Sequence, residues 1–403
     1  MTAVLVSHPH VAAFSVGLAR SLAAENKLAA YYTGIAVVEN TPAGRAAGWL
    51  AARKPVLNNR ILQGIPSKRL RGLSAVEALT RMAGRALKGR TPSVSPYDLL
   101  FDGHDLAVSL APWPTETGSI YAYEDGSLLT FRKAARLGLE RVWDLPLPHY
   151  RTIEKVLDEE ARRWPDAPIG PLHREPDWKQ RRKDAELGLA TKVSVASAFT
   201  RQSLDRLNVR APVVVAPYGF PVDEFPARAQ RPSGPFRVLA VGSHDLRKGT
   251  PYLLEAWRRA EIPDAELHLV GPLKLAKKFL DRYAGQFHHR PHVPKRALGE
   301  QYAAADVLAF PTLGDGFGLV MQEAMCCGTP VVTTPCGGGP ECITHGVDGW
   351  LVPPRDVDAL VEHLRDCAAN RDRTYAIGQA ARARAERSTW RDAGAVAVRA
   401  LGF

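Results

Sequence analysis

The sequence predicts an α/β protein of two doubly wound domains that face each other across a cleft. The chain of 403 residues, 45% of them hydrophobic, can bury more than one core. Short apolar runs alternate with stretches of helical spacing, the pattern of parallel strands covered by helices on both faces. The alternation stops once, at residues 221–235, which are rich in proline, glycine and polar residues, and then restarts. We therefore expect a linker between two similar domains.

The first domain begins with an apolar run at residues 3–8, followed at 11–24 by apolar residues at helical spacing. This pattern predicts a strand that leads into a helix. The same reasoning predicts strands at residues 97–104, 119–125, 191–200 and 213–220 and a helix at 150–164. Ligands of such sheets bind at the carboxyl ends of the strands, so polar residues there are candidates for a site.

The second domain repeats the alternation and is expected to form a second parallel sheet. Strands are expected at residues 236–243, 265–272, 306–312 and 330–334, and helices at 250–260, 298–305 and 319–327. Two alanine-rich stretches at 358–370 and 375–401 predict helices that close the chain.

The charge is unevenly distributed. The formal net charge is +11, and in residues 53–90 Glu77 is the only acid among the basic residues Arg53, Lys54, Arg60, Lys68, Arg69, Arg71, Arg81, Arg85, Lys88 and Arg90. This basic stretch is either a solvated face or a surface for anionic lipid or another acidic polymer. Nucleic acid is not expected as a partner, because aromatic residues suited to base stacking do not interleave with these charges.

Neither a membrane span nor a signal peptide is indicated by the hydropathy pattern. We therefore expect a cytoplasmic protein, associated at most peripherally with the inner face of a membrane. The cysteines lack paired metal-ligand spacing, which predicts reduced, mostly buried thiols at Cys326, Cys327, Cys336, Cys342 and Cys367 and no metal site.

The stretch "GDGFGLVMQEAMCCGTPVVTT", residues 314–334, carries the strongest signal for chemistry. Its glycines permit a tight turn from a strand into a helix. The amides of Gly318 and Leu319 would then lie at a helix N-terminus, which suits a diphosphate. Taken alone, the glycines favour the plainer interpretation, a turn that binds nothing.

Two carboxylates and a basic loop strengthen the case for a ligand. Glu323 could bond the vicinal hydroxyls of a ribose, and Asp315 those of a sugar on the other side of the anion. The alternative for Glu323 is a surface carboxylate that favours the helix dipole. In "HDLRKG", Arg247 and Lys248 form either a clamp for charge on a departing diphosphate or a solvated basic loop.

"GDGFGLVMQEAMCCGTPVV" resembles the signature of the family 4 retaining glycosyltransferases, usually E-G-F-G-L-x-x-x-E-A-M-A-x-G-x-P-V-V, with its two acids eight residues apart. Four further stretches resemble other segments of the same family: "VLAVGSHDLRKGTPYLLEAW", "QYAAADVLAFPT", "CGGGPECITHGVDGWLVPPRD" and "VVVAPYGFPVDEF". The specific motifs cover about Ser194 to Asp356. The first domain agrees with the family only in its general pattern.

The resemblance implies the GT-B fold, in which the C-terminal of two Rossmann-like domains binds a nucleotide-sugar and the last helix returns to the N-terminal domain. Trp390 and its surroundings match that helix. The expected division is an acceptor domain at 1–225, a linker at 226–236, a nucleotide-sugar-binding domain at 237–385 and a returning helix at 386–403.

The resemblance also implies roles for the signature residues. Glu323 would hold the ribose, Lys248 the diphosphate, and the amides of Phe317, Gly318 and Leu319 phosphate or sugar. The full expected donor set is Gly242, Arg247, Lys248, Asp315, Gly316, Phe317, Gly318, Leu319 and Glu323, and the expected catalytic residues are His104, Lys248 and Asp315.

In the first domain, "LLFDGHDL" resembles a strand that ends in a histidine, which makes His104 either a cleft residue or a structural one. "YAYEDGS" resembles the next strand, so Glu124 and Asp125 are either acceptor ligands or a surface turn. Acceptor contacts are also expected from His8 and His10 in the first loop. "WDLPLPHY", residues 143–150, could supply an aromatic stacking surface or core packing.

The chain departs from the family pattern at several positions. Asp315 replaces the usual glutamate, Ser243 stands where an arginine is common, and Glu124 stands where many relatives have a histidine. The first loop, "SHPHVAAF", lacks the double glycine often found there, and without G-x-G-x-x-G it also disfavours a dehydrogenase.

These features together predict a retaining transferase that moves a sugar from a UDP- or GDP-sugar to a hydroxyl acceptor without a cofactor or metal. The basic stretch suggests a lipid-linked acceptor in polysaccharide or glycolipid assembly. The alternatives are a nucleotide-sugar epimerase of the same fold and a non-catalytic nucleotide-sugar-binding protein.

Overall fold

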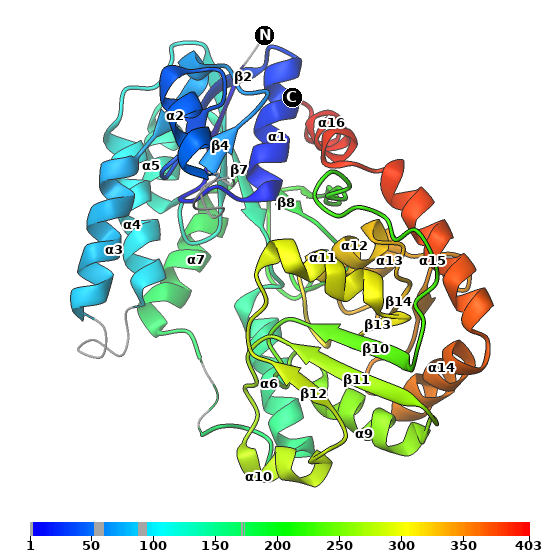
Figure 1. Cartoon of the computed structure of the whole chain (residues 1–403). Helices are drawn as coiled ribbons and strands as arrows, with labels where there is room; N and C mark the ends of the chain where they lie inside the picture. The colour runs from blue at the N-terminus through cyan, green and yellow to red at the C-terminus, as the bar shows by residue number, and fades with distance from the viewer. Residues whose placement is uncertain (1–2, 52–59, 88–94, 171, 173) are drawn as a thin grey trace.

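Two parallel sheets, each covered by helices on both faces, make up the protein (Figure 1). The computed structural model describes residues 3–51, 60–87, 95–170, 172 and 174–403. The first sheet has the strand order β5-β2-β1-β6-β7-β8-β9 and the second the order β12-β11-β10-β13-β14-β15. The two doubly wound domains expected from the alternating pattern are therefore confirmed.

The first sheet consists of short, largely buried strands with parallel pairing throughout. Its strands are β1 (Ala3–Ser7), β2 (Leu28–Thr33), β5 (Leu70–Gly72), β6 (Thr117–Tyr123), β7 (Glu140–Leu145), β8 (Lys192–Val195) and β9 (Val213–Val215). Its helices are α1 (Ala13–Ala24), α2 (Pro42–Ala51), α3 (Ser74–Leu87), α4 (Pro96–Leu110), α5 (Leu128–Arg136), α7 (Asp177–Leu189) and α8 (Ala198–Gln202). A small two-stranded sheet pairs β3 (Val37–Val38) with β4 (Ile61–Leu62).

The expected strand at residues 97–104 is wrong, because this segment lies inside helix α4. Ser95 and Asp98 form a reciprocal capping box, and Pro96 occupies the first turn, where its missing N–H costs no hydrogen bond. These start signals outweigh the short apolar run "LLF". His104 therefore lies on a helix rather than at the end of a strand.

The second sheet holds the candidate site at its carboxyl edge. Its strands are β10 (Phe236–Val241), β11 (Ala265–Val270), β12 (His288–Arg290), β13 (Val307–Phe310), β14 (Val331–Thr333) and β15 (Trp350–Leu351). Its helices are α9 (Thr250–Ala260), α10 (Lys277–Leu280), α11 (Lys295–Ala304), α12 (Leu319–Cys326), α13 (Gly339–Cys342), α14 (Val357–Ala369) and α15 (Arg371–Glu386).

Helix α6 (Tyr150–Arg163) follows strand β7 of the first sheet but packs against the second domain (Figure 1). Trp164 lies edge-on to Tyr252 and to Phe279, with ring centroids 5.4 and 5.8 Å apart. Glu160, with no exposed surface, accepts hydrogen bonds at 2.6 Å from the Tyr252 hydroxyl and from Nε of Arg355. The chain thus enters the second domain well before the linker.

The last helix, α16 (Trp390–Leu401), returns to the first domain and packs along α1. Gly17 and Gly394 allow the close approach, because a Cβ on Gly394 would lie 2.1 Å from Oγ of Ser21 and one on Gly17 would lie 3.3 Å from the Trp390 ring. A break at Thr389, whose hydroxyl caps α16 together with Asp392, separates this helix from α15. The division into 1–225, 226–236, 237–385 and 386–403 remains a proposal. Helix α6 belongs to the first of these segments by sequence, yet it packs against the second domain.

Candidate active site

The glycine turn lies between strand β13 and helix α12. Gly318 adopts a positive φ of 93° immediately before the helix, a conformation that glycine tolerates best. A Cβ on Gly318 would lie 3.0 Å from the Phe310 ring and 2.8 Å from Met321. Since the first N–H groups of a helix have no partner within the helix, the residues from Leu319 onward present donors at a positive dipole end.

The turn also contacts the first domain. The Gly316 carbonyl accepts hydrogen bonds from Oγ of Ser197 at 2.6 Å and from Oγ1 of Thr200 at 3.2 Å. A Cβ on Gly316 would lie only 1.7 Å from the carbonyl oxygen of Pro146. Glycine at this position therefore lets the loops at the carboxyl ends of β7, β8 and β13 meet.

Two cations from the loop after β10 meet the same turn. Lys248 forms an ion pair with Asp315, and its Nζ lies 4.8 Å from the centroid of the Phe310 ring. Arg247 donates a hydrogen bond of 2.6 Å to the Gly314 carbonyl. Asp315 is only 8% exposed and also accepts from the Gly316 N–H at 2.8 Å. The expected cationic clamp and the first signature acid are thus in contact.

Glu323 lies on α12 with its side chain toward α11. The Tyr302 hydroxyl donates to its Oε2 at 2.8 Å. Burial raises the pKa of Glu323, opposed by this hydrogen bond and by the charge of Lys295. The other donor candidates contribute mainly backbone: Phe317 is buried at 3% exposure, Leu319 is 37% exposed, and Gly242 ends β10 with φ 126°.

His8 and His104 lie buried at the end of β1. His104 Nε2 lies 3.0 Å from the Ser7 hydroxyl, and His104 and His8 are 1% and 3% exposed. Burial lowers the pKa of His104 to about 3 and that of His8 well below its ordinary value, so both rings are neutral. His10, in the loop after β1, lines a cavity of about 430 Å³ together with Arg60 and Arg81.

Glu124 and Asp125 follow β6 and belong to a network of buried charges. Lys183 of α7 lies 3.3 Å from Glu124, 3.7 Å from Asp125 and 2.8 Å from Glu175. Burial raises the pKa of Glu124 to about 8, opposed by Lys183 and reinforced by the neighbouring acids. The surface-turn interpretation is therefore wrong for Glu124, which is 8% exposed.

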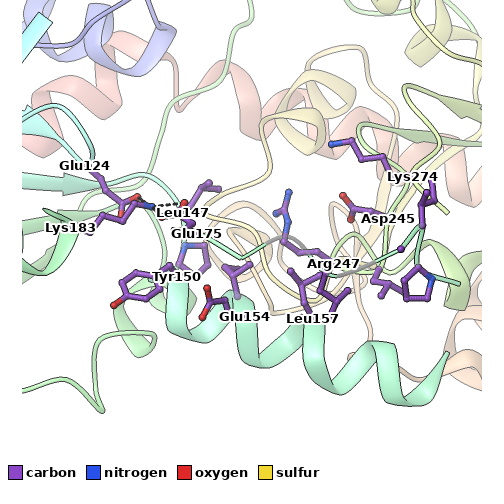
Figure 2. A pocket seen from close by; sticks show the side chains of 17 residues that line it. Glu124, Leu147, Tyr150, Glu154, Leu157, Glu175, Lys183, Asp245, Arg247 and Lys274 are labelled. Carbon is purple, nitrogen blue, oxygen red and sulfur yellow. Dashed lines mark hydrogen bonds and ion pairs between the residues drawn. The ribbon is translucent and has the colours of Figure 1, made fainter. Parts of the chain in front are cut away.

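A pocket of about 570 Å³ lies between the domains and is bounded by α6 (Figure 2). Glu124 and Lys183 line one end, and Arg247 and Lys274 line the other. Sequence reasoning missed Lys183 and the α6 residues, because no motif marks them. Of the segment 143–150, Tyr150 lines the pocket, whereas Trp143 is fully buried and donates to Glu186 at 3.1 Å.

Several expectations concern residues away from the cleft. Arg53, Lys54, Lys88 and Arg90 of the basic stretch lie outside the described residues. The cysteines are free, and all but Cys336 are buried.

One group in the described ranges could hold a metal ion, Glu266 with His268 and His288, but Arg237 already contacts Glu266 at 3.1 Å. No helix in the described part of the chain is long and apolar enough to cross a membrane.

Known proteins share both sequence and fold with this chain. A family model described as glycosyl transferases group 1 matches residues 235–370. D-inositol 3-phosphate glycosyltransferase of Paenarthrobacter aurescens is 31% identical over 288 residues, covering 66% of this chain and 68% of the relative. A relative of the same name from Arthrobacter sp. is 31% identical over 294 residues, and the alignment covers 66% of each chain.

Solved structures match the whole architecture. Sucrose-phosphate synthase from Thermosynechococcus elongatus has a TM-score of 0.66 at 20% identity, covering 100% of this chain and 98% of that one. HepE from Anabaena, solved in complex with UDP and glucose, has a TM-score of 0.63 at 17% identity, covering 100% and 99%. At these identities the likeness shows the fold alone.

The two facing parallel-sheet domains have the GT-B fold, and the relatives that share this sequence show that the protein is a glycosyltransferase. Within that class, the chain belongs to the glycosyl transferases group 1 family.

Proposed function

We propose that this glycosyltransferase moves a sugar from a UDP- or GDP-sugar to a hydroxyl acceptor with retention of configuration. The observation that carries the proposal is the contact of Lys248 with Asp315 in the glycine turn that leads into α12, the helix that also carries Glu323. A GDP-mannose-dependent mannosyltransferase from Mycolicibacterium smegmatis among the relatives, and the structure of HepE with UDP-glucose, support a nucleotide-sugar donor. The relatives named here are transferases, so an epimerase or a non-catalytic binder has no comparable support.

The donor would displace an existing ion pair. An incoming diphosphate competes with Asp315 for Lys248 and also meets the amide donors of α12. Asp315, once released, can accept hydrogen bonds from sugar hydroxyls, and Glu323 from the ribose. Arg247 supplies the second cation, since Ser243 stands where an arginine is common in the family. The backbone of Gly242, Gly316, Phe317, Gly318 and Leu319 completes the donor site.

The remaining roles follow from burial and charge. The departing diphosphate itself would take the acceptor proton, so no protein nucleophile is required. We propose that Arg247, Lys248 and the helix N-terminus supply the positive potential without a metal ion. His104 and His8, both buried, act as positioning residues, His104 through Ser7, while Glu124, Asp125 and His10 form the acceptor side.

The acceptor is proposed to be lipid-linked, with the enzyme at the cytoplasmic face of a membrane. On α3, Leu79 and Met82 are 65% and 64% exposed, and Arg81 and Arg85 are exposed beside them. Exposed apolar side chains flanked by arginines suit an anionic bilayer surface. Sedimentation should show binding to anionic vesicles at low salt that high salt weakens, and equal binding to neutral vesicles would contradict the proposal.

Donor binding tests the proposed function directly. Protection against thermal unfolding should be measured across UDP-, GDP-, ADP- and dTDP-sugars, together with release of the nucleotide. One donor should stabilise the wild type and lose its effect in Glu323→Ala. Glu300→Ala, an exposed carboxylate on the neighbouring helix α11, serves as the matched control. If no nucleotide-sugar protects the wild type, the proposal fails.

A further inference from the structure

The pocket beside α6 combines an apolar wall with two charged ends, of which Arg247 and Lys274 form the one toward the second domain (Figure 2). The other end carries the charged side chains of Glu124 and Lys183. The wall that extends from it is apolar and is built by Leu147, Ile153, Leu157 and Ile169. Its volume of about 570 Å³ lies within the ordinary range for small-molecule sites.

The apolar wall is accessible to a ligand. Leu147 is 46% and Ile169 64% exposed, although both are large aliphatic residues. Large aliphatic side chains gathered around a concave surface mark a binding site more often than isolated exposed ones do. The part of the wall that α6 contributes, Ile153 and Leu157, is held in place, because α6 is anchored to the second domain through Glu160.

The polar end offers an unused acceptor. Oε1 of Glu124 is buried and has no hydrogen-bond partner among the residues that the structure describes. Buried polar atoms normally have a partner, so this oxygen is suited to a hydroxyl group of a ligand. Lys183, 3.3 Å from Oε2 of the same carboxyl, holds the side chain in position.

We propose that this pocket binds the acceptor, and that the acceptor carries an apolar group next to its reactive polar part. A hydroxyl-bearing head would lie at Glu124, and an alkyl or aromatic substituent would cover Leu147 and Ile169. This assignment rests on the proposed transferase function and specifies its acceptor class. Burial of the apolar substituent supplies affinity, and the polar end orients the head.

Binding of three glucosides tests the proposal on the full chain. Methyl, hexyl and phenyl β-glucoside are titrated below micelle-forming concentrations by calorimetry. We expect the hexyl or phenyl compound to bind at least tenfold more tightly than the methyl compound. A hexyl preference indicates an aliphatic chain, and a phenyl preference indicates an aromatic group. Equal affinity of all three compounds would overturn the proposal.

Variants locate the binding site. Leu147→Asp and Ile169→Asp should each remove most of the preference, and both sites are exposed enough for the protein to remain folded, which thermal unfolding checks. Leu137→Asp is the matched control, since Leu137 is 57% exposed at the end of α5 and does not line the pocket. Retention of the preference in both pocket variants would contradict the assignment.

Competition separates this inference from the proposed function. Free UDP or GDP should leave hexyl glucoside binding unchanged, and displacement would assign the pocket to the donor and overturn the proposal. A protein that binds hexyl glucoside but no nucleotide-sugar would instead refute the transferase function. Donor binding without any glucoside preference would refute only the acceptor assignment.

Discussion

Lys248 forms an ion pair with Asp315, and both side chains are largely buried. Neither charge can be removed without leaving the other in a poorly solvated position. The pair therefore orients two side chains that we propose as donor ligands, and a bound diphosphate and sugar would replace each as the other's partner. Because aspartate is one methylene shorter than the usual glutamate, this contact brings the lysine close to the turn.

We expect Lys248→Ala to lower turnover by roughly a hundredfold, the effect of losing one electrostatic contact to the transition state. Turnover is measured with the donor identified by the binding panel, and thermal unfolding shows whether the variant is folded. Lys277→Ala, on the exposed helix α10, is the control and should retain normal turnover. A Lys248 variant within tenfold of wild type would refute the assignment.

Glu124 links folding stability to pH. Its pKa of about 8 in the folded protein exceeds the value of about 4.3 expected in the unfolded chain, so the folded state binds the proton more tightly. This contribution to stability is complete below the unfolded pKa and is lost as the pH rises through 8. The charged groups that face the carboxyl are Lys183, Asp125, Glu175 and Glu186.

We expect wild type to lose more stability than Glu124→Gln between pH 6 and 9, by up to about 1.4 kcal/mol per pH unit for one proton. Urea unfolding at each pH measures the free energy of unfolding of both proteins. The titration of the groups around Glu124 contributes to both values and largely cancels in their difference. Parallel stability curves would show that the Glu124 carboxyl titrates near its ordinary pKa.

At the scale of single elements, α6 is the clearest case of tertiary packing that decides where a helix belongs. Its sequence, residues 150–164, predicts a helix, and the structure confirms one at Tyr150–Arg163. Local periodicity does not say which sheet the helix will cover. The buried Glu160 and the ring of Trp164 find their partners in the second domain, which also creates the wall of the pocket.

We expect Glu160→Ala to lower the free energy of unfolding by about 3 kcal/mol, because it removes the buried partner of Arg355 and Tyr252. Glu159→Ala is the control: Glu159 also pairs with Arg355, at 3.0 Å, but is 32% exposed, so its loss should cost less than about 1 kcal/mol. Urea unfolding compares the two. Equal effects would show that α6 is not anchored through Glu160.

At the scale of the whole molecule, the chain crosses between domains through α6, through the segment after β9 and through α15 and α16. The contact of α16 with α1 depends on Gly17 and Gly394, which bring the two helix backbones together. The returning helix implied by the family resemblance therefore has a specific packing basis.

We expect Gly394→Val to destabilise the protein by about 2 kcal/mol, because its side chain would collide with Ser21 and the Gly17 carbonyl. Thermal unfolding measures the change. Gly188→Ala on α7 is the control, since its Cβ would meet nothing within 4 Å and alanine favours the helix. A Gly394→Val variant as stable as wild type would show that α16 is only loosely attached.

The sequence by itself determined the two alternating domains, the strand-to-helix turn at 314–319 and the order of residues in the donor signature, because these depend on local periodicity and turn chemistry. It did not reveal the six-residue strands β2 and β7, and the short apolar run "LLF" predicted a strand where the capping box at Ser95 begins a helix. Only the tertiary structure decided that α6 covers the second domain, that Lys248 pairs with Asp315 and that Glu124 shares a pocket with residues of α6. Each of these contacts joins residues distant in sequence, and packing of complementary buried surfaces, rather than local pattern, selects such partners.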